Sequence, residues 1–454
     1  MTATVIERFA QQAPAATLFV GLLSRILSDE SLDRIFRDHS QHQVESPVLF
    51  SYLVRMLTPV VVGKSKTVNT SHRELGLNVS RQAIYDKLKG VEADVSTAMI
   101  RETSRQLIQL QDMAGLDQED LIPGYDCYIL DGKTYNATEH RLVETRTDSR
   151  CPLPGRCISL LDAQHRIFVD VEGDHNANRC ERKIFARMLP CLKKGVVYIA
   201  DRNFCDGNLI EGFIDAGSYF IVRLHGASPA RREIAGGKSK EIRKGNGERI
   251  TEREIEVELP KRGWTKVRLT SVHLKKKTHN GDRVIHSISN LPKSVTSISI
   301  SKGYRHRWTI ENSFGYISRC LNAEIRTLCY PSAAGLCFAL ALLLYNVMQT
   351  IMQFMSKFGK QPKSATKIEL SMHYVASEIS SCYAGLLIAT DQKEWQPIVS
   401  MSPRKFVAWL AQVASYANLS KYKKDPRGPK KKPPPRKFNG SRHVATQKIL
   451  EARK

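Results

Sequence analysis

Three carboxylates stand where a folded chain can gather them around metal ions. Asp131 follows the apolar run YIL, Asp201 follows VVYIA, and Glu311 lies in the stretch YRHRWTIENSFGYISR (residues 304–319), which has the apolar spacing of a helix. Side chains at the ends of buried strands emerge at a crevice of the sheet. Hard divalent cations prefer carboxylate oxygens, and a pair of such ions about 3.5 to 4 Å apart promotes phosphodiester displacement. The pattern predicts Asp131, Asp201 and Glu311 as metal-binding, catalytic residues.

Each of these residues also has an ordinary structural interpretation. An aspartate before glycine, as in Asp131–Gly132, is common in turns, and an aspartate before a helix, such as Asp201, is a common N-cap. Glu311 has the spacing to pair with Arg307 one helical turn earlier. The catalytic prediction therefore depends on the three residues together, in the order strand, strand, helix, which is that of a ribonuclease-H-like nuclease.

The helix around Glu311 carries two further polar residues on the same face. Tyr304, Arg307 and Glu311 stand at offsets of 0, 3 and 7, which places the first and last within about 20° of each other at 100° per residue. If Asp131 and Asp201 lie opposite, this face forms one wall of a metal and phosphate site. Trp308 and Trp264 are expected in the core.

These motifs resemble bacterial insertion-sequence transposases of the DDE superfamily. The relevant group has a helix signature of Tyr, two residues, Arg, three residues, Glu, six residues, Lys, and a large β insertion between its second Asp and its Glu. Tyr304, Arg307 and Glu311 fit this signature, and YILDGKTY and YIADRNFCD resemble the two strands that carry the aspartates. The chain departs from the pattern at the last position, where Ser318 stands in place of Lys and Arg319 follows.

The resemblance implies a transposase that uses two Mg²⁺ or Mn²⁺ ions, held by Asp131, Asp201 and Glu311. It also implies that Arg307 grips a phosphate near the cut, that Tyr304 contacts a phosphate oxygen, and that Arg319 is a candidate to replace the family lysine. The implied partners are double-stranded DNA, both the terminal inverted repeats of the element and its target, and a second copy of the chain in a synaptic complex. The implied location is the bacterial cytoplasm, in association with the nucleoid.

The charge of the chain favours a polyanionic partner. The 454 residues include 69 Lys and Arg against 45 Asp and Glu, a net charge of +24. Residues 420–454 hold 13 of these basic residues against two acidic ones, a balance of +11, so the rest of the chain, the folded body, still carries +13. The apolar run LCFALALLL at residues 336–344 is shorter than the roughly 18 residues of a membrane span, so it predicts a buried helix and no membrane association.

The elements that must position these residues form an α/β fold. The predicted core is a ribonuclease-H-like mixed sheet, interrupted by a β-rich insertion and flanked by helical N- and C-terminal regions. The predicted units are a helical DNA-binding region (1–120), the first part of the core (121–226), the insertion (227–300), the final core helices (301–360), a C-terminal helical region (361–419) and a disordered basic tail (420–454).

A possible DNA-reading element lies in HRELGLNVSRQAIYDKLKGV, residues 72–91. One helix is expected to end at Gly76, and Ser80 is expected to cap a second helix that buries Ile84 and Leu88. This second helix exposes Arg81, Gln82 and Lys89 as candidate DNA contacts. The pattern fits either a helix-turn-helix or a plain helical hairpin.

Two alternatives to an active transposase remain open. Because Ser318 stands in place of the family lysine, the sequence is also consistent with a catalytically weakened, transposase-derived DNA-binding protein. The same fold also serves structure-selective nucleases, which do not require specific DNA ends.

Overall fold

A computed structural model describes residues 4–41, 48–76, 78–116, 119–135, 153–224, 226, 229–243, 248–278, 281–323, 325, 330–362, 368–426 and 428. Most of the predicted basic tail therefore lies outside the described residues. Its described beginning is packed rather than disordered. A 3₁₀ helix, Leu419–Tyr422, buries Tyr422, whose hydroxyl is hydrogen-bonded to Glu378.

The N-terminal region is helical, as predicted. Many of its helices begin at a side chain that accepts a backbone N–H, such as Thr4, Ser28, Thr67 and Ser80. Its helices are α1 (Val5–Gln12), α2 (Pro14–Ile26), α3 (Asp29–His39), α4 (Phe50–Val61), α5 (Val68–Leu75), α6 (Arg81–Gly90) and α7 (Ala93–Met113).

The core sheet has the strand order β3-β2-β1-β4-β5. The first three strands are antiparallel, while β4 and β5 run parallel to β1, which is the arrangement expected of a ribonuclease-H-like core. The predicted fold class is confirmed. The strands are β1 (Cys127–Thr134), β2 (Arg156–Asp162), β3 (Phe168–Asp174), β4 (Val197–Ala200) and β5 (Tyr219–Arg223).

Side chains alternate between the two faces of this sheet and enter two separate apolar clusters. Leu130 and Tyr198 pack in one cluster with α8 (Glu181–Ala186) and α9 (Gly207–Asp215). Ile129 and Ile199 pack in the other, which includes α7 and the later helices. Asp131 is therefore on the Ile129 face, the face toward the later helices.

The β-rich insertion extends the core sheet instead of forming a separate one. Its last strand pairs with β5, and the described residues form one sheet of ten strands. Arg268 in this insertion is buried and donates to Glu252 and to the carbonyls of Leu291, Pro292 and Val295, which fixes the loop before the next helix. The strands are β6 (Arg231–Glu233), β7 (Lys240–Arg243), β8 (Arg249–Leu259), β9 (Gly263–His273) and β10 (Val284–Ser289).

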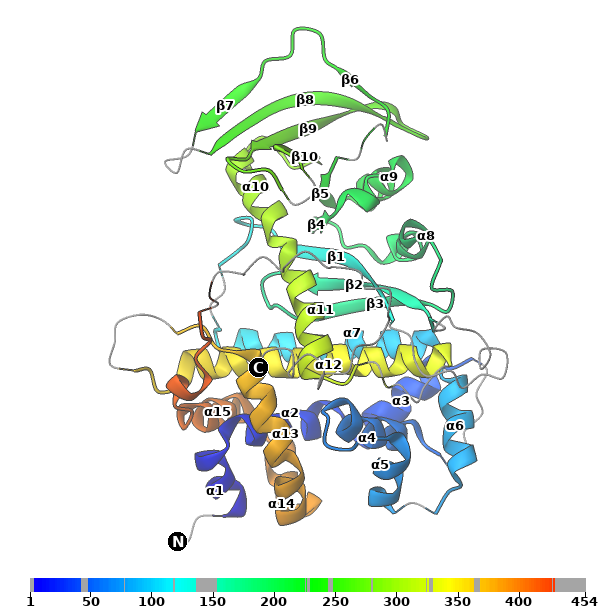
Figure 1. The fold of residues 1–454 in the computed structure, drawn as a ribbon, viewed down its shortest axis with the longest axis vertical. Coiled ribbons are helices and arrows are strands. Elements are labelled where there is room, and N and C mark those ends of the chain that lie inside the picture. Colours follow the sequence, from blue (N-terminus) through cyan, green and yellow to red (C-terminus); the bar gives the residue numbers. More distant parts are fainter. Residues whose placement is uncertain are drawn as a thin grey trace, which may run out of the picture.

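Six α-helices follow the insertion within the described residues. They are α10 (Ser297–His306), α11 (Trp308–Cys320), α12 (Pro331–Phe358), α13 (Met372–Ala389), α14 (Gln392–Val399) and α15 (Pro403–Ser415). Helix α12 is long and apolar enough to cross a membrane by length and composition, but 83% of its most apolar window is buried inside the protein. It runs beside α7 beneath the core sheet and packs against both N- and C-terminal helices (Figure 1). It is the central core helix of the chain.

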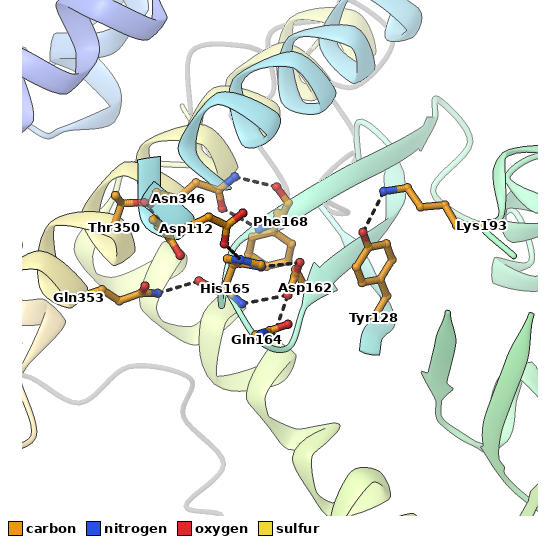
Figure 2. Close-up of polar contacts among 11 residues, drawn as sticks. Asp112, Tyr128, Asp162, Gln164, His165, Phe168, Lys193, Asn346, Thr350 and Gln353 are labelled. Atoms are coloured by element: carbon orange, nitrogen blue, oxygen red, sulfur yellow. Dashed lines mark hydrogen bonds and ion pairs between the residues drawn. The ribbon is translucent and has the colours of Figure 1, made fainter. Parts of the chain in front are cut away.

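A polar network attaches the core sheet to α7 and α12 (Figure 2). His165, in the turn between β2 and β3, places Nδ1 2.9 Å from Asp162 Oδ2 and Nε2 3.0 Å from Asp112 Oδ1 on α7. From α12, Gln353 donates to the His165 carbonyl, and Asn346 donates to and accepts from the backbone of Phe168 at 2.7 Å each. These contacts tie the sheet that carries Asp131 to the helical layer below it.

Candidate active site

Asp131 and Asp201 lie on neighbouring parallel strands. The pairing of β1 with β4 runs in register from Cys127–Val197 to Ile129–Ile199, so each aspartate follows its paired isoleucine by two residues. Asp131 does not end its strand, as the sequence suggested, because β1 continues to Thr134 and Asp131 pairs with Ser159 of β2. The physical reason is that β2 is a longer neighbour than β4, so β1 keeps a hydrogen-bonded partner beyond the end of β4.

Asp201 stands directly after β4 and also serves as a cap. Its Oδ1 accepts the backbone N–H of Asn203 at 2.7 Å, which begins a short 3₁₀ helix, Arg202–Phe204. The capping role predicted as an alternative is thus present, and it leaves the second carboxylate oxygen outside that hydrogen bond. The end of a short parallel strand places this group at the edge of the sheet.

Arg307 connects Asp131 to Glu311. Its Nη1 lies 3.4 Å from Asp131 Oδ2, and its Nη2 donates to Glu311 Oε1. The side chains of Asp131 and Arg307 are only 18% and 14% exposed. The guanidinium therefore bridges a carboxylate of the sheet and one of the helix, and this keeps Glu311 close to Asp131.

The helix predicted to carry Tyr304, Arg307 and Glu311 is broken at Arg307. Helix α10 ends at His306 and α11 begins at Trp308, while Arg307 keeps right-handed helical dihedral angles. Backbone bonds from Arg307 to Tyr304 and from Ile310 to Arg307 span three residues, which tightens the helix locally. The prediction of one uninterrupted helix is wrong, although α10 runs directly into α11 (Figure 1).

Tyr304 lies on α10, half-buried beside charged groups. Burial raises the pKa of its hydroxyl, while the positive charges of Arg307 and Arg223 act in the opposite direction. The tyrosine is therefore a neutral hydrogen-bond donor next to the cleft. Arg223, at the end of β5, is mostly buried and pairs with Asp282 at 2.8 Å.

The electrostatics of the cleft favour a cation. Burial raises the pKa of Asp131 to about 7; Arg307 opposes this rise, and the nearby charges of Asp201 and Glu311 add to it. Burial would lower the pKa of Arg307, but the hydrogen bond to Glu311 and the nearby groups Tyr304, Glu311 and Asp131 together raise it and keep the guanidinium charged. Asp131 and Glu311 thus share the Arg307 guanidinium, and Asp201 lies close enough for its charge to act on Asp131. Positive charge placed near these carboxylates relieves their mutual repulsion.

The donor set fits a hard divalent cation in its chemistry. Within the described parts of the chain, no group of three His, Cys, Asp or Glu side chains already lies at metal-ligating spacing. Arg307 bridges two of the three carboxylates instead. Asp131, Asp201 and Glu311 supply only oxygen donors, which Mg²⁺ and Mn²⁺ prefer, and these are the residues that would hold such ions.

Arg319 reaches back toward the Glu311 end of α11. A Cβ atom built on Gly315, one turn after Glu311, would lie 3.2 Å from an Arg319 guanidinium nitrogen, and the guanidinium carbon lies 5.4 Å from the centroid of the Tyr316 ring. Ser318 is exposed on the same helix. The absence of a side chain at Gly315 lets Arg319 lie along the helix toward the cleft.

The predicted pair of helices at residues 72–91 is confirmed. Helix α5 ends before Gly76, whose φ of 66° is left-handed, and Ser80 accepts the N–H of Ala83 at the start of α6. Ile84 and Leu88 are buried. Arg81 and Gln82 are exposed, and Gln82 donates to Asp86 at 2.8 Å.

Lys89 is engaged within the protein. Its ammonium lies 3.1 Å from Asp86 and 4.6 Å from the centroid of the Tyr330 ring. It is therefore less available to DNA than its place in the sequence suggested.

The expectation that both tryptophans are in the core is wrong. Trp308 is 59% exposed beside the junction of α10 and α11, and Trp264 is 39% exposed beneath the guanidinium of Arg232. Trp308 is the first residue of α11 and Trp264 is the second residue of β9, so each stands at the end of its element.

Two residues beside Asp201 were not predicted from the sequence. Asn203 donates its side-chain amide to Glu181, the first residue of α8, and its backbone N–H to Asp201. A glutamate in the first turn of a helix is ordinary, so Glu181 had no distinguishing sequence signal. Gly132 was the one sequence signal for this contact, because a glycine inside a strand leaves space for another side chain. The interpretation of Asp131–Gly132 as a turn gave the glycine a different role.

Comparisons with known proteins place this site in a family. The family described as "Transposase DDE domain" matches residues 122–347, which include Asp131, Asp201 and Glu311. A search of curated proteins found no matching sequence. Among solved structures, the chain is similar to a piggyBac transposase in a cryo-EM structure of its synaptic complex with hairpin DNA, with 10% sequence identity, a TM-score of 0.39 and coverage of 84% of each chain. Through residues 122–347, the chain belongs to the transposase DDE domain family.

Proposed function

We propose that this protein binds the terminal inverted repeats of an insertion sequence and, with divalent metal, catalyses phosphodiester hydrolysis and strand transfer during its transposition. The main support is that Asp131 and Asp201 follow neighbouring parallel strands in register, and that Arg307 joins Asp131 to Glu311. Two Mg²⁺ or Mn²⁺ ions bound there would activate the attacking oxygen and stabilise the leaving oxygen. The proposal locates the protein in the bacterial cytoplasm, on the nucleoid.

Each residue of the proposed site has its own role in binding metal or phosphate. Asp131, Asp201 and Glu311 hold the ions through their carboxylates. Arg307 is placed to grip a phosphate oxygen, since guanidinium matches phosphate with paired hydrogen bonds. Tyr304 donates a hydrogen bond from its neutral hydroxyl, and Arg319 adds charge along α11.

DNA contacts outside the cleft complete the proposal. Arg81 and Gln82 on α6 face solvent and are placed to contact duplex DNA at the element ends, and Lys89 contributes after release from Asp86. A second copy of the chain joins the two ends in a synaptic complex, which then captures target DNA. The net charge of +24 supports this assembly on a polyanion.

A nicking assay tests the proposed chemistry. The substrate is DNA that carries the inverted repeats flanking the coding region, incubated with Mg²⁺ or Mn²⁺. Cleavage by the wild-type protein is expected to fall to background in Asp131→Asn, Asp201→Asn and Glu311→Gln, while binding to the ends persists. Glu172→Gln is the matched control, because Glu172 is a carboxylate of the same sheet that pairs with Arg187 away from the cleft.

The same assay distinguishes the alternatives. Undiminished cleavage in a variant would remove that residue from the site. Wild-type protein that binds the ends but never cuts them would indicate a catalytically weakened DNA-binding protein. Cleavage of branched DNA without any need for the repeats would indicate a structure-selective nuclease.

A further inference from the structure

Gly132, next to Asp131, makes room for another side chain. It lies inside β1, paired with Ile158, and forms no turn. A Cβ atom on residue 132 would lie 2.3 Å from Oε1 and 2.5 Å from Cδ of Glu181. Contacts this short do not occur between real atoms, so the Glu181 carboxylate fills the volume that any other residue at position 132 would occupy. The glycine is needed for space and not for backbone conformation.

Glu181 is held in this space by two donors. Arg156 Nη2 donates to Oε1, and Asn203 Nδ2 donates to Oε2. Arg156 is itself fixed from its Nη1, which donates to the Arg179 carbonyl at 3.0 Å. The Arg156 and Glu181 side chains are each 17% exposed. The ion pair with Arg156 offsets the Glu181 charge, so this carboxylate serves as a fixed hydrogen-bond acceptor on the α8 face of the sheet.

Asn203 carries the restraint from Glu181 to Asp201. Its side-chain amide donates to Glu181, and its backbone N–H donates to Asp201 Oδ1 at 2.7 Å. Asn203 is the middle residue of a three-residue 3₁₀ helix, which has few hydrogen bonds of its own. The side-chain contact therefore fixes the direction of the backbone N–H that orients the Asp201 carboxylate.

We propose that Glu181 is a positioning residue for the metal site, acting on Asp201 through Asn203 and seated against Gly132. This inference rests on the proposed function, because it assigns Asp201 to a metal site. Groups that orient the ligands of a metal typically contribute 10- to 100-fold to its affinity. Glu181 and Asn203 act in series, so the loss of either side chain is sufficient to release Asp201 from this restraint.

The test is binding of Mn²⁺ alone, measured on the full chain by the loss of the electron paramagnetic resonance signal of free Mn²⁺. Glu181→Ala and Asn203→Ala are each expected to weaken Mn²⁺ affinity about 10- to 100-fold. The double variant is expected to be no weaker than either single one, whereas independent effects would add. Gly132→Ala should give a similar loss by displacing the carboxylate. Thermal unfolding of each variant checks folding, and Glu172→Ala is the control carboxylate.

The outcomes separate this inference from the proposed function. Wild-type protein that does not bind Mn²⁺, or an Asp201→Asn variant that binds it normally, would overturn the proposed metal site and the inference with it. Loss of affinity in Asp201→Asn combined with normal affinity in Glu181→Ala and Asn203→Ala would overturn the inference alone. If Glu181→Ala does not fold, Asn203→Ala and Glu181→Gln provide the test. A glutamine side chain has one acceptor oxygen, so it can replace Glu181 toward only one of the two donors, Arg156 and Asn203. Additive losses in the double variant would also overturn it.

Discussion

Asp131 and Asp201 lie side by side because β1 and β4 are parallel neighbours in register, with Ile129 paired to Ile199 two residues before the two carboxylates. This relationship makes a shared metal site possible, and it depends on residues 70 positions apart in the chain. The third carboxylate, Glu311, comes from a helix and is held through Arg307. The arrangement leads to testable consequences for the guanidinium, for α11, for α6 and for the network at His165.

Arg307 is expected to stabilise the metal-free protein and to lose that role when metal binds. Arg307→Ala leaves Asp131 buried near two other carboxylates, which should cost about 3 kcal/mol of unfolding free energy. Millimolar Mg²⁺ should restore part of this loss, because a cation that binds only the folded state stabilises it. Urea denaturation with and without Mg²⁺ measures the effect. Lys302→Ala on α10 is the control, because Lys302 and its partner Glu119 are both exposed to solvent. An equal loss there, or no response to Mg²⁺, would contradict the prediction.

Arg319, and not Ser318, is expected to supply the positive charge on α11. Arg319→Ala should weaken DNA binding and reduce the slope of log affinity against log salt by about one. Ser318→Ala should change neither quantity, since Ser318 is exposed and uncharged. Filter binding at several salt concentrations measures both. Equal effects of the two substitutions would show that the contact does not depend on the Arg319 charge.

On α6, Arg81 is expected to contribute more to DNA binding than Lys89. Arg81→Ala should reduce the salt slope by about one, because Arg81 is exposed to solvent. Lys89→Ala should have a smaller effect, because the ammonium already contacts Asp86 and the Tyr330 ring. Fluorescence anisotropy on end-sequence DNA compares the two variants. A larger loss for Lys89→Ala would mean that α6 rearranges when DNA binds.

Stability is expected to fall at alkaline pH through His165. Burial would lower its pKa, but the hydrogen bonds and charges of Asp162 and Asp112 raise it to about 9. The folded state therefore binds the proton more tightly than the unfolded state, whose pKa is about 6.5. The contribution of the charged imidazole is fully present below about pH 6.5 and disappears as the pH rises through 9.

Comparison with His165→Gln measures this contribution. The difference in unfolding free energy between wild type and variant should be roughly 2 to 3 kcal/mol at pH 6 and should shrink steadily toward pH 9.5. Guanidinium denaturation across that range gives the profile. Asp112→Asn, which removes one of the two partners drawn in Figure 2, should show an intermediate dependence. A constant difference between wild type and His165→Gln would exclude the titration of His165 as its cause.

Much of the local structure was predictable from the sequence, because local patterns have local causes. Gly76 and Ser80 set helix boundaries through backbone conformation and capping, which depend on a few adjacent residues. Apolar runs before Asp131 and Asp201 predicted buried strands, and the strand order then matched the predicted ribonuclease-H-like core. The break at Arg307 was not predictable in this way, because apolar spacing does not specify where backbone hydrogen bonds tighten from four residues to three.

The residue types available to the site could be read from the amino-acid sequence: three carboxylates, a guanidinium and a phenol at spacings that suit metal and phosphate. Their arrangement depends on the fold, which sets β4 next to β1, lets Arg307 bridge Asp131 and Glu311, and seats Glu181 against Gly132. Hydrophobic periodicity predicts whether a side chain is buried, but it does not predict which distant side chain it contacts. Those contacts follow from strand pairing and packing across the whole chain, and they set the geometry on which the proposed chemistry depends.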